Sequence, residues 1–463
     1  MNIKINLKNN KKLYVQIFDE IKKRIENGEL KSNSKLLSIR TLAKQLNVNP
    51  ATVMKAYDLL EEKNYIYKIT GSGCYVSNEF ENIDKNVEID IVNMNFNKNI
   101  KRYYDLANSY PDRSFFKLHI LKNSINDSFN KYGIDMFFYS EIDGDKTLKK
   151  LIVEKFYSKH RINNIDKIKI LSSSTHALDI ICKKLLKPGD KIVVEGYTNP
   201  NALSIFKKYN IQIISISLEK NGINIEKFKS LLKQEKIKFL YTIPNFNNPT
   251  NIITTDTKKK ELINLAKKYK FYIIEDDVLS DISFNKKLNT LKSFDFNNTN
   301  VFYLFSFSKI FLPGIRLSYV TIPNNINTLN IETSPSIFIQ KFFYKFLKKI
   351  DFERYKNSLK IFYEKKYKFF KENLEQIEQI EILNNSEGGF YFWIKLPNWM
   401  DSKKLYEICL KHNLAIIPGN IFHHKYIFSN YIRVSYSSIE KEKILDAINI
   451  LKKCIYNYSV LKK

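Results

Sequence analysis

Apolar positions in the amino-terminal part of the chain follow the spacing of three short amphipathic helices. In the first stretch they recur at intervals of four, at Leu13, Ile17, Ile21 and Ile25. This spacing predicts a helix that ends at Gly28, since glycine commonly terminates helices. Ser38 can cap a second helix over 39–46, and Pro50 suits the first turn of a third. The third helix would bury Val53, Ala56, Tyr57 and Leu60.

Two short apolar runs follow these helices, over 65–69 and 74–76, and Gly71, Ser72 and Gly73 lie between them. Apolar runs on both sides of a glycine turn predict a β-hairpin. Three helices followed by such a hairpin make a winged helix-turn-helix, which we assign to residues 1–77.

The rest of the chain has a different pattern. Residues 78–103 are polar and rich in asparagine, which predicts a linker. Over 104–463, short apolar runs alternate with helical stretches such as 177–186 and 258–269, and this alternation predicts an α/β domain with a mostly parallel sheet. We expect a large part to about residue 330 and a smaller carboxyl-terminal part over about 331–463. The expected strands are 169–171, 191–195, 211–216, 239–243, 272–275 and 301–305.

Composition and charge narrow the function only slightly. A chain of 463 residues with 44% hydrophobic side chains can build a large core and is unlike a disordered protein. The net charge of +28 is spread along the chain, with +6 on residues 1–80 and +22 on the remainder. Charge alone therefore does not locate a nucleic-acid surface. Only 8 of the basic residues are arginines, against 68 lysines, so the position of each arginine is informative.

Other residue types bear on the compartment. The four cysteines are dispersed without a C-x-x-C pair, which is typical of a reducing compartment. The start of the chain has no apolar leader, and no apolar run approaches the roughly 18 residues of a membrane helix. We therefore expect a cytoplasmic protein without a membrane partner. The six histidines show no metal-ligand spacing, so no metal site is expected.

The predicted helix-turn-helix carries side chains that suit contact with double-stranded DNA. Its sequence, LSIRTLAKQLNVNPATVMKAYDLLEEKNYIYKITGSGCYVS, resembles GntR-type DNA-binding domains almost throughout. The resemblance implies that Arg40 contacts a backbone phosphate. It further implies that residues near the start of the third helix reach base edges and phosphates, and that residues of the hairpin approach the minor groove. The first group is Asn49, Thr52 and Lys55, and the second is Lys68, Gly71 and Gly73. The alternative is a small helical domain that mediates only protein contacts.

Reactive residue types follow several predicted strands of the larger domain, where ligand sites of parallel sheets lie. The segment SFSKIFLPGIRLSYV places Lys309 after an apolar run and Arg316 seven residues later. The segment FYIIEDDVLSDISF ends another run in the adjacent carboxylates Asp276 and Asp277. An amine, an arginine and adjacent carboxylates at these strand ends are candidate ligand-binding groups.

These motifs resemble, in order and content, those of fold-type I pyridoxal-phosphate aminotransferases over about residues 104–463. The resemblance implies that Lys309 forms the Schiff base with pyridoxal 5'-phosphate and that Arg316 binds its phosphate. It also implies that Asp276, with Asp277 as the alternative, pairs with the ring nitrogen and keeps it protonated.

Three further motifs extend the resemblance. Asn248 in TIPNFNNPTN matches the residue that binds the ring hydroxyl, although an Asn-Pro pair can also simply start a turn. Ser173, Ser174 and Thr175 in SSSTHALDII match a phosphate cradle at a helix amino-terminus, although serines there can also be caps. Arg433 in NYIRVSYSS matches the arginine that binds the α-carboxylate of the substrate through both arms of its guanidinium.

Three positions depart from the aminotransferase pattern. The aromatic residue that stacks on the cofactor ring falls at Asn199, with Tyr197 as a candidate substitute. Val278 replaces the tyrosine expected after the acidic pair, and Asn251 replaces a glycine. The first two changes remove ring contacts, so we expect the cofactor to bind and efficient transamination to be in doubt.

The whole chain resembles MocR-type regulators, which join a GntR winged helix to an aminotransferase-like domain. This resemblance implies a homodimer that binds pyridoxal phosphate and senses an amino-acid-like or cofactor-related effector, which changes how the DNA-binding domains are presented. Two alternatives stay open. One is an active aminotransferase with an accessory DNA-binding domain, and the other is a regulator that binds DNA without the cofactor.

Overall fold

The computed structural model describes the chain in two compact units, residues 1–99 and 100–463, and we treat each by itself. The predicted linker 78–103 lies outside the described residues, as do Gly28 and Gly71. The described residues are 11–26, 29–30, 34–62, 65–69, 72–76, 104–139, 141–327, 329–383 and 387–460.

The first unit contains three helices and a hairpin, as the sequence predicts. Helix α2 begins after Ser38, whose Oγ accepts a hydrogen bond from the Thr41 N–H at 3.1 Å. Pro50 is the first residue of α3, and Gly73 opens the second hairpin strand with a φ of 129°, which favours glycine. The elements are α1 (Leu13–Glu26), α2 (Ile39–Leu46), α3 (Pro50–Glu62), β1 (Ile66–Ile69) and β2 (Gly73–Val76). The fold is the predicted winged helix-turn-helix.

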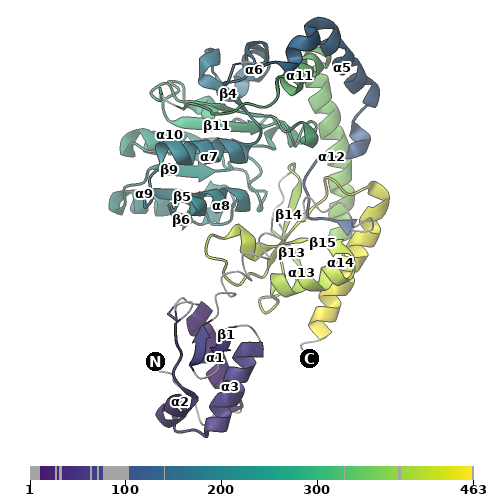
Figure 1. Cartoon of the computed structure of the whole chain (residues 1–463). Helices are drawn as coiled ribbons and strands as arrows, with labels where there is room; N and C mark the ends of the chain where they lie inside the picture. The colour runs from purple at the N-terminus through teal and green to yellow at the C-terminus, as the bar shows by residue number, and fades with distance from the viewer. Residues whose placement is uncertain are drawn as a thin grey trace. The chain divides into compact units, whose positions relative to one another are not determined.

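The second unit is built on a seven-stranded sheet, whose strands follow one another down the upper part of Figure 1. The strands follow the order β4-β12-β11-β10-β9-β5-β6, and all neighbours are parallel except those of β12. This sheet confirms the predicted α/β class. The strands are β4 (Ile168–Leu171), β5 (Lys191–Glu195), β6 (Gln212–Ile216), β9 (Phe239–Thr242), β10 (Tyr272–Asp277), β11 (Val301–Ser306) and β12 (Ser318–Thr321).

Helices cover both faces of this sheet, and their positions decide which way the strand-end residues face. Helices α7 (Ser174–Leu185) and α8 (Pro200–Lys208) pack on one face together with Ile274 of β10. Helices α9 (Ile225–Gln234) and α10 (Asp256–Tyr269) pack on the other face with Ile273. Side chains alternate between the faces of a strand. Asp276 therefore lies on the α7/α8 face and Asp277 on the opposite face.

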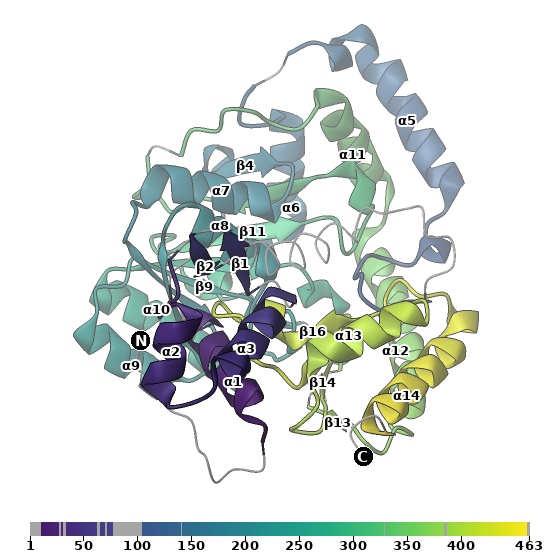
Figure 2. The ribbon, with the colours of Figure 1, turned by 60° about the horizontal axis from the view of Figure 1, so that its bottom comes forward.

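The carboxyl-terminal part carries a separate four-stranded antiparallel sheet, in the order β13-β14-β17-β16. Figure 2 shows helices α12, α13 and α14 grouped around it. The beginning of the unit is joined to this part, because β3 (Tyr104–Asp105) pairs with β15 (Leu414–Ala415). The other helices and strands of this carboxyl-terminal part are β13 (Glu381–Ile382), β14 (Tyr391–Lys395), β16 (Ile417–Pro418), β17 (Tyr431–Ser435), α12 (Phe352–Leu374), α13 (Ser402–Lys411) and α14 (Ile444–Val460).

Three more helices lie at the other end of the unit. They are α5 (Leu118–Tyr132), α6 (Lys146–His160) and α11 (Ile337–Lys349), and α11 packs against both α5 and α6. In the part of the chain that the structure describes, every helix is too short or too polar to cross a membrane.

Candidate functional site

Lys309 lies in the turn that follows β11, with a half-buried side chain. Its Nζ donates a hydrogen bond to Ser109 Oγ at 2.9 Å. Burial, and then the positive charges of Arg433 and Arg316, lower the pKa of this amine to about 7. A lysine with such a pKa is largely a neutral amine at slightly alkaline pH, which is the form that attacks a carbonyl carbon.

Asp276 is fully buried at the end of β10, on the sheet face that carries α7 and α8. Its Oδ2 accepts a hydrogen bond from the Tyr241 hydroxyl at 2.8 Å. Its Oδ1 is buried and has no hydrogen-bond partner among the described residues. Burial raises the pKa of the carboxyl to about 6, and the Tyr241 hydrogen bond, the nearby Asn199 side chain and the charge of Lys309 oppose that rise. A buried acceptor without a partner fits the N–H of a protonated ring nitrogen.

Asp277 has different surroundings. Its Oδ2 accepts hydrogen bonds from the hydroxyls of Ser280, at 2.8 Å, and Tyr303, at 2.7 Å. The Lys159 ammonium lies 3.5 Å from the same oxygen. Among the described residues, Asp277 Oδ1 also has no hydrogen-bond partner, but a lysine already supplies positive charge on that face. The geometry therefore favours Asp276 over Asp277 as the partner of a ring nitrogen.

Arg433 lies on β17 in the carboxyl-terminal part and is buried. One terminal nitrogen donates to Asn248 Oδ1 at 2.7 Å, and the other donates to the Ala107 carbonyl at 2.5 Å. The guanidinium carbon lies 4.6 Å from the centre of the Tyr391 ring, and Nε is buried without a partner among the described residues. The structure thus brings Arg433 and Asn248 together, although they are 185 positions apart.

The predicted phosphate ligands lie at the start of α7 and after β11. Ser173 is the cap of α7, because its Oγ accepts a hydrogen bond from the His176 N–H at 3.1 Å. Ser174 and Thr175 form the first turn and are half-buried. Arg316 is exposed, but it lies close enough to Lys309 to lower the pKa of that amine. A helix amino-terminus, hydroxyls and an arginine together suit an anion.

Tyr197 and Asn199, the two residues considered for the cofactor-ring position, lie in different surroundings. The Tyr197 ring packs 5.2 Å from Trp393 and 5.7 Å from Tyr431, and it lines a cavity whose walls include neither Lys309 nor Asp276. Asn199 instead lies close enough to the buried carboxyl of Asp276 to lower its pKa. The stacking substitute expected at Tyr197 therefore lies away from this carboxyl.

Three polar partners in the site escaped the sequence analysis. Ser109 accepts from both Lys309 and the Tyr391 hydroxyl, the latter at 3.1 Å, and Tyr241 orients Asp276. No local signal marks them, because Tyr241 and Tyr391 lie in apolar strand runs that resemble core. Ser109 lies in an ordinary polar loop.

The first unit presents part of its predicted DNA-binding set to solvent. Arg40 on α2 is exposed, as are Asn49 and Lys55, and Thr52 is half-buried. Asn49 also caps α3, since its Oδ1 accepts a hydrogen bond from the Ala51 N–H at 2.8 Å. The sequence analysis missed Met54, an α3 side chain that is 48% exposed beside these positions.

Lys68 on the hairpin has its charge already compensated. Its Nζ lies 2.6 Å from both Asp58 Oδ1 and Glu61 Oε2, two carboxylates on α3. These hydrogen bonds raise the pKa of the ammonium. Lys68 therefore has less charge to offer a phosphate than Arg40 has.

Comparisons with known proteins agree with this two-part architecture. The family model "Aminotransferase class I and II" matches residues 108–451, and the model "Bacterial regulatory proteins, gntR family" matches residues 13–76. The chain belongs to the aminotransferase class I and II family and carries a gntR-family domain at its amino-terminal end.

This chain is similar both to named transcriptional regulators and to named aminotransferases. The HTH-type transcriptional regulator NorG of Staphylococcus aureus (strain bovine RF122 / ET3-1) is 28% identical over 89% of this chain and 98% of its own length. The aromatic-amino-acid aminotransferase 1 of Thermococcus litoralis is 28% identical over 76% of this chain and 87% of its own. The kynurenine aminotransferase of Pyrococcus horikoshii, solved in complex with PMP, has a TM-score of 0.73 and 27% identity, over 87% of this chain and 99% of that one.

Proposed function

We propose that this protein is a DNA-binding transcriptional regulator that uses pyridoxal 5'-phosphate to sense an amino-acid-like effector. One observation carries the proposal. A single chain joins a winged helix-turn-helix to a site where Lys309 has a lowered pKa and Asp276 keeps an unpartnered buried oxygen. Relatives with the same two domains are named as transcriptional regulators.

Different residues of the second unit would contact different parts of the cofactor. When bound, pyridoxal phosphate supplies an aldehyde that reacts reversibly with primary amines and a ring that withdraws electrons. Lys309 would supply the amine, Asp276 would hold the proton at the ring nitrogen, and Asn248 would meet the ring hydroxyl. Arg316 and the start of α7 at 173–175 would hold the phosphate.

Arg433 would select effectors that carry an acid group. Its Nε is a buried donor without a partner among the described residues, which is costly unless a ligand accepts its hydrogen bond. A carboxylate is the natural acceptor for a guanidinium. An amino acid satisfies both requirements, since its amine can exchange with Lys309 while its carboxylate binds Arg433.

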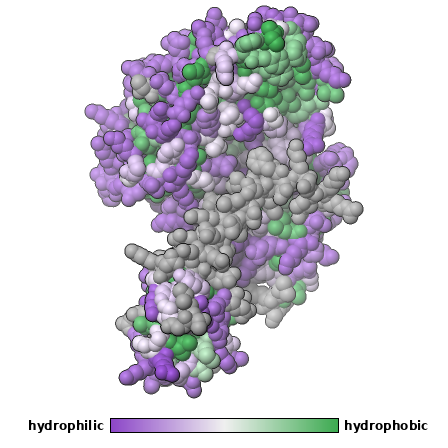
Figure 3. Space-filling model, in the orientation of Figure 1, coloured by the Kyte–Doolittle hydropathy of each residue, from purple (hydrophilic) through white to green (hydrophobic). Residues whose placement is uncertain are grey.

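We also propose that the protein is a homodimer. An apolar patch lies over the α5 and α11 end of the second unit, where Figure 3 shows a hydrophobic area. Large apolar patches that stay exposed in a monomer usually mark interfaces, so a second copy of the chain would cover this one. Its members are between 44% and 107% exposed: Leu118, Phe129, Ile134, Phe137, Phe138, Tyr139 and Ile142.

Sedimentation of the full-length protein tests the dimer. Phe138→Asp should shift the equilibrium toward monomer, because it places a charge in the covered patch. Ile361→Asp is the matched control, since Ile361 is a similarly exposed apolar residue on α12. A protein that is monomeric at all concentrations would refute the dimer. Equal shifts toward monomer in both variants would refute this patch as the dimer interface.

The proposed DNA partner also indicates where the protein works. The exposed Arg40, Asn49 and Lys55 would contact double-stranded DNA in the gntR-like unit. Because such a regulator must meet chromosomal DNA, we propose that it is cytoplasmic.

The cofactor proposal is tested by adding pyridoxal phosphate to the full-length protein and reducing the mixture with borohydride. Peptide mass mapping should place the cofactor on Lys309, and Lys309→Ala should abolish the attachment. Lys287→Ala is the control, because Lys287 is an exposed lysine outside the site. Attachment that persists in Lys309→Ala would refute the assignment. An affinity for operator DNA that is the same with and without pyridoxal phosphate would instead favour a regulator that works without the cofactor.

An active aminotransferase is the second candidate, because the chain keeps the lysine, aspartate and arginine set and is similar to named aminotransferases. Asn199 and Val278 count against fast turnover, since both replace side chains expected to contact the cofactor ring. A panel of amino acids with keto-acid acceptors separates the candidates. Sustained product formation would establish the enzyme, and no more than a single turnover would exclude it.

A further inference from the structure

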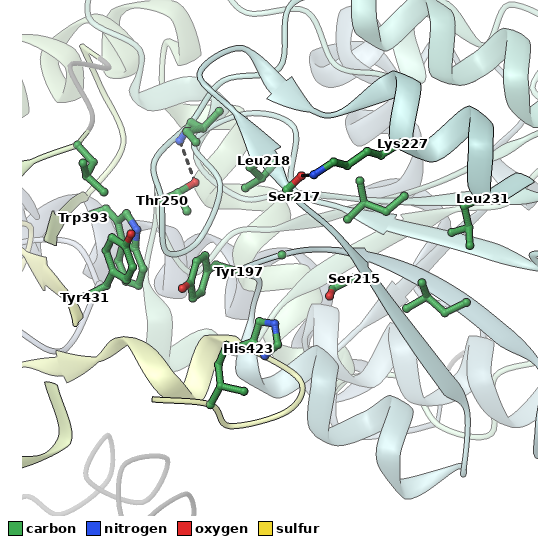
Figure 4. A pocket seen from close by; sticks show the side chains of 16 residues that line it. Tyr197, Ser215, Ser217, Leu218, Lys227, Leu231, Thr250, Trp393, His423 and Tyr431 are labelled. Atoms are coloured by element: carbon green, nitrogen blue, oxygen red, sulfur yellow. Dashed lines mark hydrogen bonds between the residues drawn. The ribbon is translucent and has the colours of Figure 1, made fainter. Parts of the chain in front are cut away.

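A cavity lies at the edge of the large sheet, near the residues proposed for the cofactor. It has a volume of about 670 Å³, within the roughly 300–1,000 Å³ of small-molecule sites. Its walls include none of the residues that we propose for the cofactor, although Tyr197 is among the lining residues (Figure 4). One side is formed by residues 214–218, at the end of edge strand β6, together with Lys227 of α9.

The opposite side of this cavity is aromatic. Trp393 and Tyr431 stack with ring centres 5.4 Å apart and an interplanar angle of 6°. Tyr197 lies against both rings, and His423 is 6.0 Å from Tyr197. Figure 4 shows Tyr197 near the stacked pair, with Ser217 and Lys227 across the cavity. Such a wall favours a planar ring, since aromatic pairs gain energy beyond the area they bury.

The polar side of the cavity is cationic. Lys227 is exposed, and its Nζ donates to Ser217 Oγ at 3.3 Å. Among the described residues the lining contains no aspartate or glutamate, while Ser215, Ser217 and Thr250 add hydroxyls. Burial lowers the pKa of His423, so this ring is neutral near pH 7 and can serve as a polar contact. A single cation beside hydroxyls, with no competing carboxylate in the lining, suits an anionic group.

We propose that this cavity binds a carboxylate that carries an aromatic ring, with the ring on the Tyr197, Trp393 and Tyr431 wall and the acid group at Lys227. Such a site goes beyond the proposed cofactor and effector function, because it requires neither Lys309 nor pyridoxal phosphate.

The cavity shares its walls with the elements of the cofactor site. Tyr431 precedes Arg433 by two positions on β17, and Thr250 follows Asn248 by two positions. Arg433 and Asn248 are joined by the 2.7 Å hydrogen bond. A ligand in this cavity would therefore contact residues two positions away from each partner of that bond.

The experiment uses full-length protein without cofactor and 3-phenylpropionate as the probe. The chain has two tryptophans, so Trp399→Phe leaves Trp393 as the only tryptophan reporter in the cavity wall. We expect a saturable change in its fluorescence. Lys227→Gln should lower the affinity for 3-phenylpropionate by about tenfold, because it removes a charged hydrogen bond. The affinity for neutral 3-phenylpropanamide should change by less than about twofold. Lys233→Gln, an exposed lysine on the same helix, should change neither affinity.

Arg433→Leu separates this cavity from the proposed effector site. If 3-phenylpropionate bound at Arg433 instead, Arg433→Leu would abolish its binding and Lys227→Gln would not. That result would overturn the proposal. Absence of saturable binding, or equal affinities of acid and amide in the unsubstituted protein, would also overturn it. Lys309→Ala should bind the probe normally, so failure of the cofactor proposal would leave this result unaffected.

Discussion

The bond between Tyr241 and Asp276 offers the sharpest test of how the second unit holds a cofactor. Tyr241→Phe removes one hydroxyl, and with it the hydrogen bond of 2.8 Å to Asp276 Oδ2. Both side chains are buried, so water does not readily replace the lost donor. The bond favours the ionised carboxyl, and the variant must therefore have a higher pKa at Asp276.

The size of the change follows from the kind of bond that is lost. A hydrogen bond to a charged group contributes about 1.5–3 kcal/mol, and one pKa unit corresponds to about 1.4 kcal/mol. The pKa of Asp276 is about 6 in the unsubstituted chain. Its midpoint should rise by about one to two units in Tyr241→Phe. At neutral pH a substantial fraction of the carboxyl would then be protonated and unable to hold a protonated ring nitrogen.

Titration with pyridoxal phosphate at a series of pH values measures this shift. Affinity should fall with decreasing pH in both proteins, and the fall should begin at higher pH in Tyr241→Phe. Tyr303→Phe is the matched control, because it removes an equally buried bond of 2.7 Å to Asp277. If Tyr303→Phe moved the profile and Tyr241→Phe did not, Asp277 would be the ring partner. If neither variant moved the profile, no carboxylate of β10 would have that role.

Three other outcomes follow from the described residues. The rate of covalent attachment at Lys309 should rise about tenfold per pH unit below its pKa of about 7 and level off above it, whereas a lysine of ordinary pKa would keep rising in borohydride trapping. In fluorescence anisotropy, Arg40→Ala should lower the affinity for all DNA sequences alike and reduce the slope of log affinity against log salt concentration by about one. Lys68→Ala should have a smaller effect, because two carboxylates already compensate the charge of Lys68. Tyr57→Phe should lower the free energy of unfolding of the first unit by about 0.5–1.5 kcal/mol in urea, because the hydroxyl donates to the Leu37 carbonyl at 2.8 Å.

The fold was predictable because its signals are local. The helix spacing, the Ser38 cap and Pro50 gave the elements of the first unit, and each short apolar run of the second unit became a strand within two residues of the predicted bounds. The antiparallel placement of β12 was not predictable, because pairing direction depends on chain crossings far from the strand. The same holds for the pairing of β3 with β15, which joins residues 310 positions apart.

The site was predictable only where residues sit in a recognisable motif. Lys309, Asn248 and Arg433 have such motifs, and the structure places them around one buried region. The choice between Asp276 and Asp277 needed the strand, because adjacent residues face opposite sides of the sheet. Ser109 could not have been found, since it approaches Lys309 only through folding of segments 200 positions apart.

The hydrogen bond between Arg433 and Asn248 gives the proposed regulator a physical basis for sensing. An effector alters a conformational equilibrium only if its contacts differ between the two states. In the described structure, the terminal nitrogens of Arg433 on β17 are hydrogen-bonded to Asn248 and to the Ala107 carbonyl. A carboxylate that binds the guanidinium through both arms must displace or share these bonds. Binding an acid therefore changes the link between the carboxyl-terminal part and the large sheet, whereas a neutral amine at Lys309 leaves it intact. The side chain that selects the effector is thus also the one that can transmit its presence.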